Sequence, residues 1–226
     1  MSVLEKEVET TSGGTAVREI ELDAQTVQAG KGFYNACRRF RDIVCSLLAL
    51  LVLWPFMVIT AVAIVIDSPG ASPIFVQERI GKNGKHFKMY KFRSMYMDAE
   101  EGTPQLSQDD DPRVTKVGKW LRKYRLDELP QFWNILRGDM SIVGPRPERR
   151  YFINQIEKEA PYYCMVYKIR PGLTSWGPIK IGYTDTLQKM IQRLNYDIVY
   201  MENMSLRLDI KIMFHTISVI LNGKGK

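Results

Sequence analysis

Residues 43–66 read IVCSLLALLVLWPFMVITAVAIVI, a run of 24 residues without a formal charge. A helix of this length, rising about 1.5 Å per residue, is long enough to cross a bilayer hydrocarbon core of roughly 30 Å. The alternative reading of the same run is a buried helix of a soluble protein. We therefore predict a membrane segment that anchors the rest of the chain at the bilayer surface.

Pro55 lies at the middle of this run, directly after Trp54. A proline inside a helix removes a backbone hydrogen bond, and its ring bends the helix. Basic residues stand near both ends of the run, as is typical of cytoplasmic flanks. They are Lys31, Arg38, Arg39 and Arg41 before it and Arg79, Lys82, Lys85, Lys88, Lys91 and Arg93 after it. We expect the segment either to turn at Pro55 and return to the same side, or to cross the bilayer as a kinked helix.

The whole chain of 226 residues is 45% hydrophobic, enough for one domain with a core of its own. We expect a flexible acidic tail over residues 1–30, a membrane segment over 31–67 and one cytoplasmic domain over 68–226. The net charge is +7, but the tail carries −4, so residues 31–226 carry +11. That surplus favours anionic partners: lipid head groups, nucleic acid or phosphate substrates. The cysteines and histidines lack metal-ligand spacing, so no zinc site is expected.

A strand pair is predicted where the cytoplasmic domain begins. Residues 74–76 and 87–95 have the composition of strands, and an Asn-Gly turn at residues 83–84 separates them. Alternation along the second strand puts Lys91 and Arg93 on one face. These two cations fit either a solvated basic edge or an anion-binding site.

Two adjacent carboxylates, Asp127 and Glu128, stand at the start of a predicted helix that ends at Gly138. Pro130 must lie in the first turn of that helix to be tolerated, which sets the start of the helix near the carboxylates. The helix dipole favours acidic residues there, so the pair needs no chemical explanation. The same position also attracts phosphate, and a carboxylate there can act as a nucleophile or hold a divalent cation.

Cations that could neutralise a phosphate beside this pair lie in constrained backbone. Lys91 and Arg93 belong to the predicted strand, Arg146 stands between two prolines, and Arg170 precedes Pro171. Among the other segments, the acidic run ending at Asp111 is predicted to cap a helix over 114–121 rather than to hold a metal. Residues 187–202 and 205–221 read as amphipathic helices that pack on the core or lie on the membrane.

Four blocks of this sequence resemble those of the bacterial initiating sugar transferases, the monotopic phosphoglycosyl transferases. The blocks are Tyr90-Lys91-Phe92-Arg93-Ser94-Met95, Arg125-Leu126-Asp127-Glu128-Leu129-Pro130-Gln131, Gly138-Asp139-Met140-Ser141-Ile142-Val143-Gly144-Pro145-Arg146-Pro147 and Arg170-Pro171-Gly172, in the family's order. The resemblance covers roughly residues 33–222. It implies an α+β, mostly helical fold with an N-terminal re-entrant membrane helix hairpin, broken at Pro55, together with interfacial amphipathic helices and a small β-hairpin.

The same resemblance implies a two-step transfer at the cytoplasmic face of the bacterial inner membrane. Asp127 would attack the sugar-bearing phosphate of a UDP-sugar and expel UMP, and polyprenyl phosphate would then take the phosphosugar. Glu128 would hold Mg²⁺, and Lys91, Arg146 and Arg170 would bind phosphates; Arg93 is added from strand alternation alone. Membrane lipids are expected partners, nucleic acid is not, and a homo-oligomer is compatible with the family. The product would open an exopolysaccharide, capsule, O-antigen or glycoprotein pathway.

Two positions depart from the family's usual sequence. Many members have Ser before the proline of the membrane helix, where this chain has Trp54, whose indole we expect at the membrane interface. The family usually reads Gly-Trp-Ala-Gln where this chain has Ser175-Trp176-Gly177-Pro178, which bears on sugar or nucleotide specificity.

Two other functions fit parts of the sequence. One is a membrane-anchored basic module that binds anionic lipid or nucleic acid without catalysis, which predicts no nucleotide product and tolerance of neutral substitutions at Asp127. The other is a transferase of the same lipid-linked pathway that works in a single step, without an enzyme-bound intermediate.

Overall fold

The computed structural model describes residues 32–99, 102–108, 110–182 and 184–223, so the tail predicted over 1–30 lies outside the described residues. The described chain is mostly helical with two-stranded sheets, which confirms the predicted α+β, mostly helical class. The elements are α2 (Gly32–Asp67), β1 (Ile74–Ile80), η1 (Lys82–Gly84), β2 (His86–Phe92), α3 (Lys116–Lys123), η2 (Leu126–Glu128), α4 (Gln131–Arg137), β3 (Ser141–Val143), α5 (Arg150–Glu159), η3 (Pro161–Lys168), β4 (Gly172–Thr174), α6 (Trp176–Ile181), α7 (Leu187–Glu202) and α8 (Leu206–Leu221).

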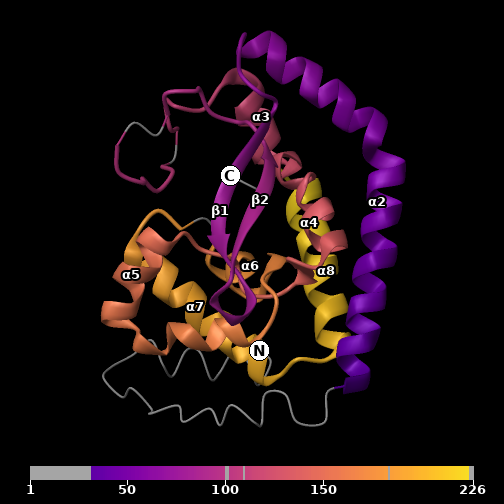
Figure 1. Ribbon diagram of the computed structural model, residues 1–226, viewed down its shortest axis with the longest axis vertical. Coiled ribbons are helices and arrows are strands. Elements are labelled where there is room, and N and C mark those ends of the chain that lie inside the picture. The colour runs from indigo at the N-terminus through magenta and orange to yellow at the C-terminus, as the bar shows by residue number, and fades with distance from the viewer. Residues whose placement is uncertain (1–31, 100–101, 109, 183, 224–226) are drawn as a thin grey trace.

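The helix α2 contains the whole apolar run, with Pro55 inside it. It is long and apolar enough to cross a membrane. In Figure 1 it runs up one side of the domain, bends in its upper part and continues across the top. The bend therefore lies within one continuous helix, as a proline causes, and no loop divides α2 into two arms. The path of α2 through a bilayer stays a prediction.

The two halves of α2 have different surroundings. The first half packs with α4 and buries Arg38, Asp42 and Ser46, while the Asp67 carboxylate at the far end accepts a hydrogen bond of 2.9 Å from the Val117 N–H of α3. Much of the apolar surface between these ends is exposed, as expected of a membrane contact. The exposed side chains include Leu47, Leu48, Leu51, Val52, Trp54, Val58, Ile59, Val62, Val65 and Ile66.

The predicted hairpin is confirmed. Strands β1 and β2 pair antiparallel from Ile74 opposite Phe92 to Ile80 opposite His86. The turn between them has Asn83 at φ 59° and Gly84 at φ 70°, the left-handed backbone that favours these two residue types.

The cap predicted for the helix after the acidic run is wrong. Helix α3 begins after Thr115, whose side chain accepts a hydrogen bond of 3.0 Å from the Gly118 N–H. Asp111 instead accepts bonds from the side chain and the N–H of Arg113 and from the N–H of Gln108, within the preceding loop. The Asp111 carboxylate, which could have capped the helix, therefore binds the Arg113 guanidinium instead.

The start predicted for the next helix is also corrected. Asp127 and Glu128 lie in η2, a separate 3₁₀ turn, and α4 begins only after Pro130. Because Pro130 has no N–H, it cannot donate to the Leu126 carbonyl, and the α-helical ladder cannot run through the carboxylates. The predicted end is confirmed: Gly138 follows α4 at φ 94°.

The short strands β3 and β4 pair in parallel and bring the two Pro-containing loops together. A Cβ on Gly172 would lie 2.2 Å from the Gly144 nitrogen, so glycine is required for this close approach. The main core lies against this pair and is formed by apolar side chains of several helices. Its most buried members include Ile135, Met140, Val143, Ile153, Ile156, Met190 and Ile212.

Candidate active site

The residues brought together around the paired carboxylates come from β2, η2 and the loop after β3. Arg146 Nη2 lies 2.6 Å from Glu128 Oε1, and Lys91 Nζ lies 3.8 Å from the same oxygen. Arg125 Nη1 lies 3.8 Å from Glu128 Oε2. Three cations therefore surround one carboxylate, with Asp127 beside it in the same turn.

An asparagine of α4 sets the position of the strand that carries Lys91. The Asn134 side chain accepts a 3.0 Å hydrogen bond from the Tyr90 N–H and donates one of 2.7 Å to the Lys88 carbonyl. The side-chain amide thus bonds a backbone N–H and a backbone carbonyl on one edge of β2, as a neighbouring strand would. Asn134 itself is fully buried. Helix α4 and β2 are consequently held in one register, with Lys91 facing the carboxylates.

The two carboxyls have different electrostatic surroundings. Burial raises the pKa of a carboxyl, but at Glu128 the cations Arg146, Lys91 and Arg125 outweigh it and lower the pKa to about 2. At Asp127, burial and the adjacent Glu128 charge together raise the pKa. Glu128 is therefore held as an anion, whereas Asp127 carries the less stabilised and more basic carboxylate.

A cavity of about 230 Å³, called the polar pocket below, opens beside Asp127. Residues of β1, β2, the segment after β2 and the Arg146 loop line it. Guanidinium groups bind phosphate oxygens in a fixed fork, so their number on these walls suits a phosphorylated ligand. The cations on its lining are Arg79, Lys91, Arg93, Arg122, Arg125, Arg146, Arg149 and Arg193.

A second cavity of about 310 Å³, called the apolar groove below, lies against Glu128. Helix α2 lines it with Cys45 and Leu53, and apolar side chains of α4 and α8 form much of the remaining wall. Arg125 lines both cavities. The paired carboxylates therefore lie between a cationic cavity and an apolar one that reaches α2.

The sequence matches the family described as Bacterial sugar transferase over residues 33–223. The chain belongs to this family. Among its relatives in this sugar transferase family, the UDP-N-acetylgalactosamine-undecaprenyl-phosphate N-acetylgalactosaminephosphotransferase of Aeromonas hydrophila is 44% identical over 85% of this chain and 45% of its own length. The UDP-glucose:undecaprenyl-phosphate glucose-1-phosphate transferases of Escherichia coli (strain K12) and Caulobacter vibrioides are 43% and 38% identical, over 82% and 81% of this chain.

These relatives differ in length from this chain. The match covers 69% of the Caulobacter vibrioides protein but 40% of the Escherichia coli one. This chain therefore spans less than half the length of the first two relatives. The resemblance inferred from the four sequence blocks is confirmed at the level of the family.

The site residues predicted for the transferase do not all meet. Lys91, Asp127, Glu128 and Arg146 lie together, as described above. Arg93 lies on the wall of the polar pocket, where its Nε donates to the Ser72 carbonyl at 2.8 Å and its guanidinium stands 5.6 Å from the centre of the Phe75 ring.

Arg170 lies at the other end of α4, outside the linings of both cavities in the described part of the chain. Its Nε donates a 2.9 Å hydrogen bond to the Gly138 carbonyl. The pKa of Arg170 is lowered, mainly by burial and then by the positive charges of Arg39 and Arg38. Trp54, one of the two departures from the family's usual sequence, is 60% exposed on α2, next to Pro55. The phosphate-binding role of Arg170 and the re-entry role of Trp54 and Pro55 stay predictions.

Other residues of the candidate site were missed from sequence. Arg125 could have been found from the sequence, because it precedes Asp127 by only two positions. In the structure it turns the chain with a backbone φ angle of 52°. Asp197 of α7 gave no such sign. Its carboxylate accepts hydrogen bonds from the Arg146 N–H at 3.4 Å and the Gly177 N–H at 3.3 Å, so it links the Arg146 loop to α6.

The burial of Asp197 can be tested through the pH dependence of the protein's stability. Burial raises the pKa of Asp197 to about 6, although Arg193 opposes the shift, whereas an unfolded Asp has a pKa of about 3.9. The folded state therefore holds this proton more tightly, and its stability falls as pH rises from about 4 to 6. Between pH 5 and 7.5, the wild type should lose about 1 to 2 kcal/mol of unfolding free energy relative to Asp197→Asn. Thermal unfolding of both proteins across this range measures it, and a constant difference would contradict the assignment.

Proposed function

We propose that this chain transfers a phosphosugar from a UDP-sugar to polyprenyl phosphate, with release of UMP. The observation that carries the proposal is the position of Asp127 and Glu128 between the polar pocket and the apolar groove. A soluble diphosphate donor and a lipid acceptor need such a junction. The relatives are named as transferases of sugar phosphates from UDP-sugars to undecaprenyl phosphate, which supports the same pair of substrates.

In the first step, the Asp127 carboxylate attacks the phosphorus that bears the sugar. The bond between that phosphorus and the bridging oxygen of the diphosphate breaks, UMP leaves with the bonding electrons, and an aspartyl phosphosugar forms. The more basic character of Asp127 suits this role. Lys91 and Arg146 supply positive charge where the phosphates lie, and phosphoryl transfer depends mainly on such positioning and neutralisation.

In the second step, a phosphate oxygen of the lipid acceptor attacks the same phosphorus. The bond to Asp127 breaks, the carboxylate is regenerated, and a polyprenyl diphosphosugar forms. The apolar groove offers a place for the first isoprene units of the lipid, and Arg125 lies at its wall to meet the phosphate. The product would enter a glycan pathway as its first membrane-bound intermediate.

Mg²⁺ is the cofactor that the donor set suits best. This ion binds one or two carboxylates and takes its other ligands from substrate phosphates and water. No group of three or more His, Cys, Asp and Glu occurs in the described residues, and the adjacent carboxylates offer the smaller set. Glu128 would hold the ion together with the donor diphosphate, because its carboxylate stays ionised. The bound ion would neutralise diphosphate charge.

The membrane position that we propose rests on α2. Its apolar surface is exposed, and basic residues stand on both sides of its apolar run, which supports a re-entrant helix with the domain at the cytoplasmic face of the bacterial inner membrane. Pro55 would then lie at the deepest part of the bend, and the exposed Trp54 beside it would contact lipid there rather than at the interface expected from the sequence. In this position the junction of the two cavities lies where an aqueous donor and a lipid acceptor can both arrive.

Cysteine labelling of intact cells tests this topology. Cys37, Cys45 and Cys164 are first replaced by Ser, and single cysteines are introduced by Ser12→Cys and Ser72→Cys. For a re-entrant helix, a membrane-impermeant maleimide should label neither position until the cells are lysed. External labelling at position 12 but not at position 72 would mean that α2 spans the bilayer.

Blocking the apolar groove should separate the two steps. Ile220 of α8 lines the groove, and Ile220→Trp should fill part of it and raise the KM for polyprenyl phosphate about 10-fold or more. Covalent labelling of the protein by a UDP-sugar should change less than about twofold, because the polar pocket is untouched. Ile210→Trp on an exposed part of the same helix is the matched control. A rise in the KM for the UDP-sugar alone would place the acceptor elsewhere.

The direct test of the function is a screen of UDP-sugars for UMP release in the presence of polyprenyl phosphate and Mg²⁺. At least one sugar should give UMP and a lipid-linked product in equal amounts. Binding of anionic lipid or nucleic acid without nucleotide release from any donor would instead support the basic binding module.

A further inference from the structure

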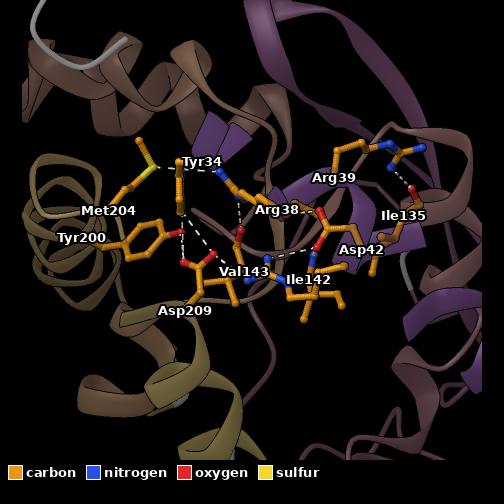
Figure 2. A network of polar contacts seen from close by, with 12 residues as sticks. Tyr34, Arg38, Arg39, Asp42, Ile135, Ile142, Val143, Tyr200, Met204 and Asp209 are labelled. Carbon is orange, nitrogen blue, oxygen red and sulfur yellow. Dashed lines mark hydrogen bonds and ion pairs between the residues drawn. The ribbon is translucent and has the colours of Figure 1, made fainter. Parts of the chain in front are cut away.

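The first turns of α2 contain a buried polar network that the reaction steps above do not use. Figure 2 shows side chains of α2 reaching from this network toward β3, α4 and α8. Arg38 is 6% exposed and Asp42 is 2% exposed, although both carry a charge. Buried charges are costly unless their hydrogen bonds are satisfied, so the partners of these two side chains are informative.

Strand β3 supplies most of these partners, while Arg41 Nη2 also donates to Asp42 Oδ1 at 3.1 Å and Arg38 Nη1 lies 3.9 Å from Met204 Sδ. Ser141 Oγ donates to Asp42 Oδ2 at 2.6 Å, and the Ile142 N–H donates to Asp42 Oδ1 at 3.3 Å. Arg38 Nε donates to Ser141 Oγ at 3.0 Å, and Arg38 Nη2 donates to the Val143 carbonyl. Two side chains, one helical turn apart on α2, therefore hold all three residues of β3 (Figure 2).

This hold fixes the beginning of the loop that carries Arg146. Only Gly144 and Pro145 separate Val143 from Arg146, and the φ angle of Pro145 is fixed by its ring. Two backbone hydrogen bonds, of 2.9 and 2.8 Å, tie the same loop to β4. A loop this short and constrained cannot absorb a shift of β3, so the shift would reach the contact between Arg146 and Glu128.

The same part of α2 also holds the helix on the Glu128 side. Arg39 donates from Nη1 to the Ile135 carbonyl at 2.6 Å and from Nη2 to the Leu136 carbonyl at 2.8 Å. These carbonyls belong to the last turn of α4 and are not bonded by N–H groups within that helix; the Ile135 carbonyl also accepts the Gly138 N–H at 3.0 Å. Because α4 begins directly after the η2 turn and Pro130, α2 fixes both sides of the ion pair in the site.

The geometry points to Arg38 and Asp42 as positioning residues that hold β3 so that Arg146 meets Glu128 and the donor phosphate. This inference rests on the proposed function. Neither residue lines the polar pocket or the apolar groove in the described part of the chain, so both act through Arg146 and do not touch substrate. The membrane helix is thus part of the active-site scaffold as well as an anchor.

A double-mutant cycle tests the inference. Asp42→Asn and the milder Ser141→Ala are each made alone and together with Arg146→Lys, in the full chain in nanodiscs, and UMP release is measured. In the wild-type background we expect kcat to fall about 10- to 100-fold for Asp42→Asn and about 3- to 10-fold for Ser141→Ala, while the KM for UDP-sugar changes less than about threefold. In the Arg146→Lys background, each change should cost less than about threefold more, because the positioned group is already altered.

Tyr34→Phe is the matched control. The Tyr34 hydroxyl donates to Asp209 Oδ2 of α8 at 3.1 Å, and within the described residues Tyr34 makes no hydrogen bond to β3. We expect this variant to change kcat less than about twofold even if it lowers the melting temperature.

Equal losses in both backgrounds would overturn the inference, because a general loss of folded enzyme multiplies the effect of Arg146→Lys. If circular dichroism shows that Asp42→Asn is unfolded, Ser141→Ala, which removes a single hydroxyl, decides by the same comparison. Absence of UMP release from the wild-type protein with every UDP-sugar would contradict the proposed function instead. The two failures are therefore distinguishable.

Discussion

Asp127→Asn should lower UMP release by about 1,000-fold or more and should abolish covalent labelling of the protein by a UDP-sugar. Asn has nearly the size of Asp but lacks the anionic oxygen that would attack phosphorus. The loss should be in kcat, because the cations of the polar pocket are unchanged and can still bind the diphosphate. The variant should also fold, since the pKa of Asp127 is raised by burial and Glu128, and a neutral side chain there relieves repulsion.

The measurement uses purified protein, Mg²⁺ and a UDP-sugar radiolabelled in the sugar, without lipid acceptor. Wild-type protein should carry label that is released when polyprenyl phosphate is added, and Asp127→Asn should carry none. Glu78→Gln, on β1 where the exposed Glu78 side chain pairs with His86, should label normally. An active wild type that never carries label would favour direct, single-step transfer, and full activity of Asp127→Asn would exclude the nucleophile altogether.

Much of the fold was predictable because its signals are local. A few neighbouring residues are enough to predict each of three elements. These are the uncharged run with Pro55, the Asn-Gly turn and the periodic helices near the C-terminus. The errors arose where a residue had two competing partners or lacked a donor. Asp111 could cap a helix or bind Arg113, and only the folded loop decides between them. The predicted start of α4 was too early, because Pro130 was expected to fit within the first turn of the helix. Without an N–H, Pro130 instead separates the η2 turn from α4.

The site was predictable where its members are close in sequence or constrained by proline. The carboxylate pair and the strand cation Lys91 were found in this way, and Arg146 between its prolines joined them in the structure. Arg170 has the same Arg-Pro pattern as Arg146, yet the pairing of β3 with β4 sends it to the opposite end of α4. Identical local patterns therefore gave different positions, because a parallel strand pair decides where each loop emerges.

The buried groups that hold the site could not be predicted. Arg38 belongs to a basic flank that the positive-inside rule explains, and Asp42 is one acidic residue beside it, so nothing in the sequence suggested a contact with β3. Asp197 is one acidic residue within an amphipathic helix. Their partners lie 99 and 51 residues away in sequence, and only tertiary packing brings them together. Such contacts carry no periodicity and no motif.

Arg146→Ala should lower kcat/KM for UMP release by about 100- to 1,000-fold, the second largest effect that we expect. Arg146 makes the shortest contact to Glu128, at 2.6 Å, and it lines the polar pocket beside Asp127. Its removal leaves Glu128 with Lys91 and Arg125, both at 3.8 Å, and removes a guanidinium from the phosphate that takes up charge in the transition state.

Arg146→Lys separates charge from shape. Lysine keeps a positive charge but cannot contact Glu128 and a phosphate through one planar fork, so we expect an intermediate loss of about 10-fold or more. Arg137→Ala, which removes a half-exposed arginine from the end of α4, should change kcat/KM less than about twofold. Equal rates for Arg146→Ala and Arg146→Lys would show that shape alone matters at this position, whereas full activity of Arg146→Lys would show that charge alone does. Wild-type activity of Arg146→Ala would remove Arg146 from the site, and the positioning role inferred for Arg38 and Asp42 would fall with it.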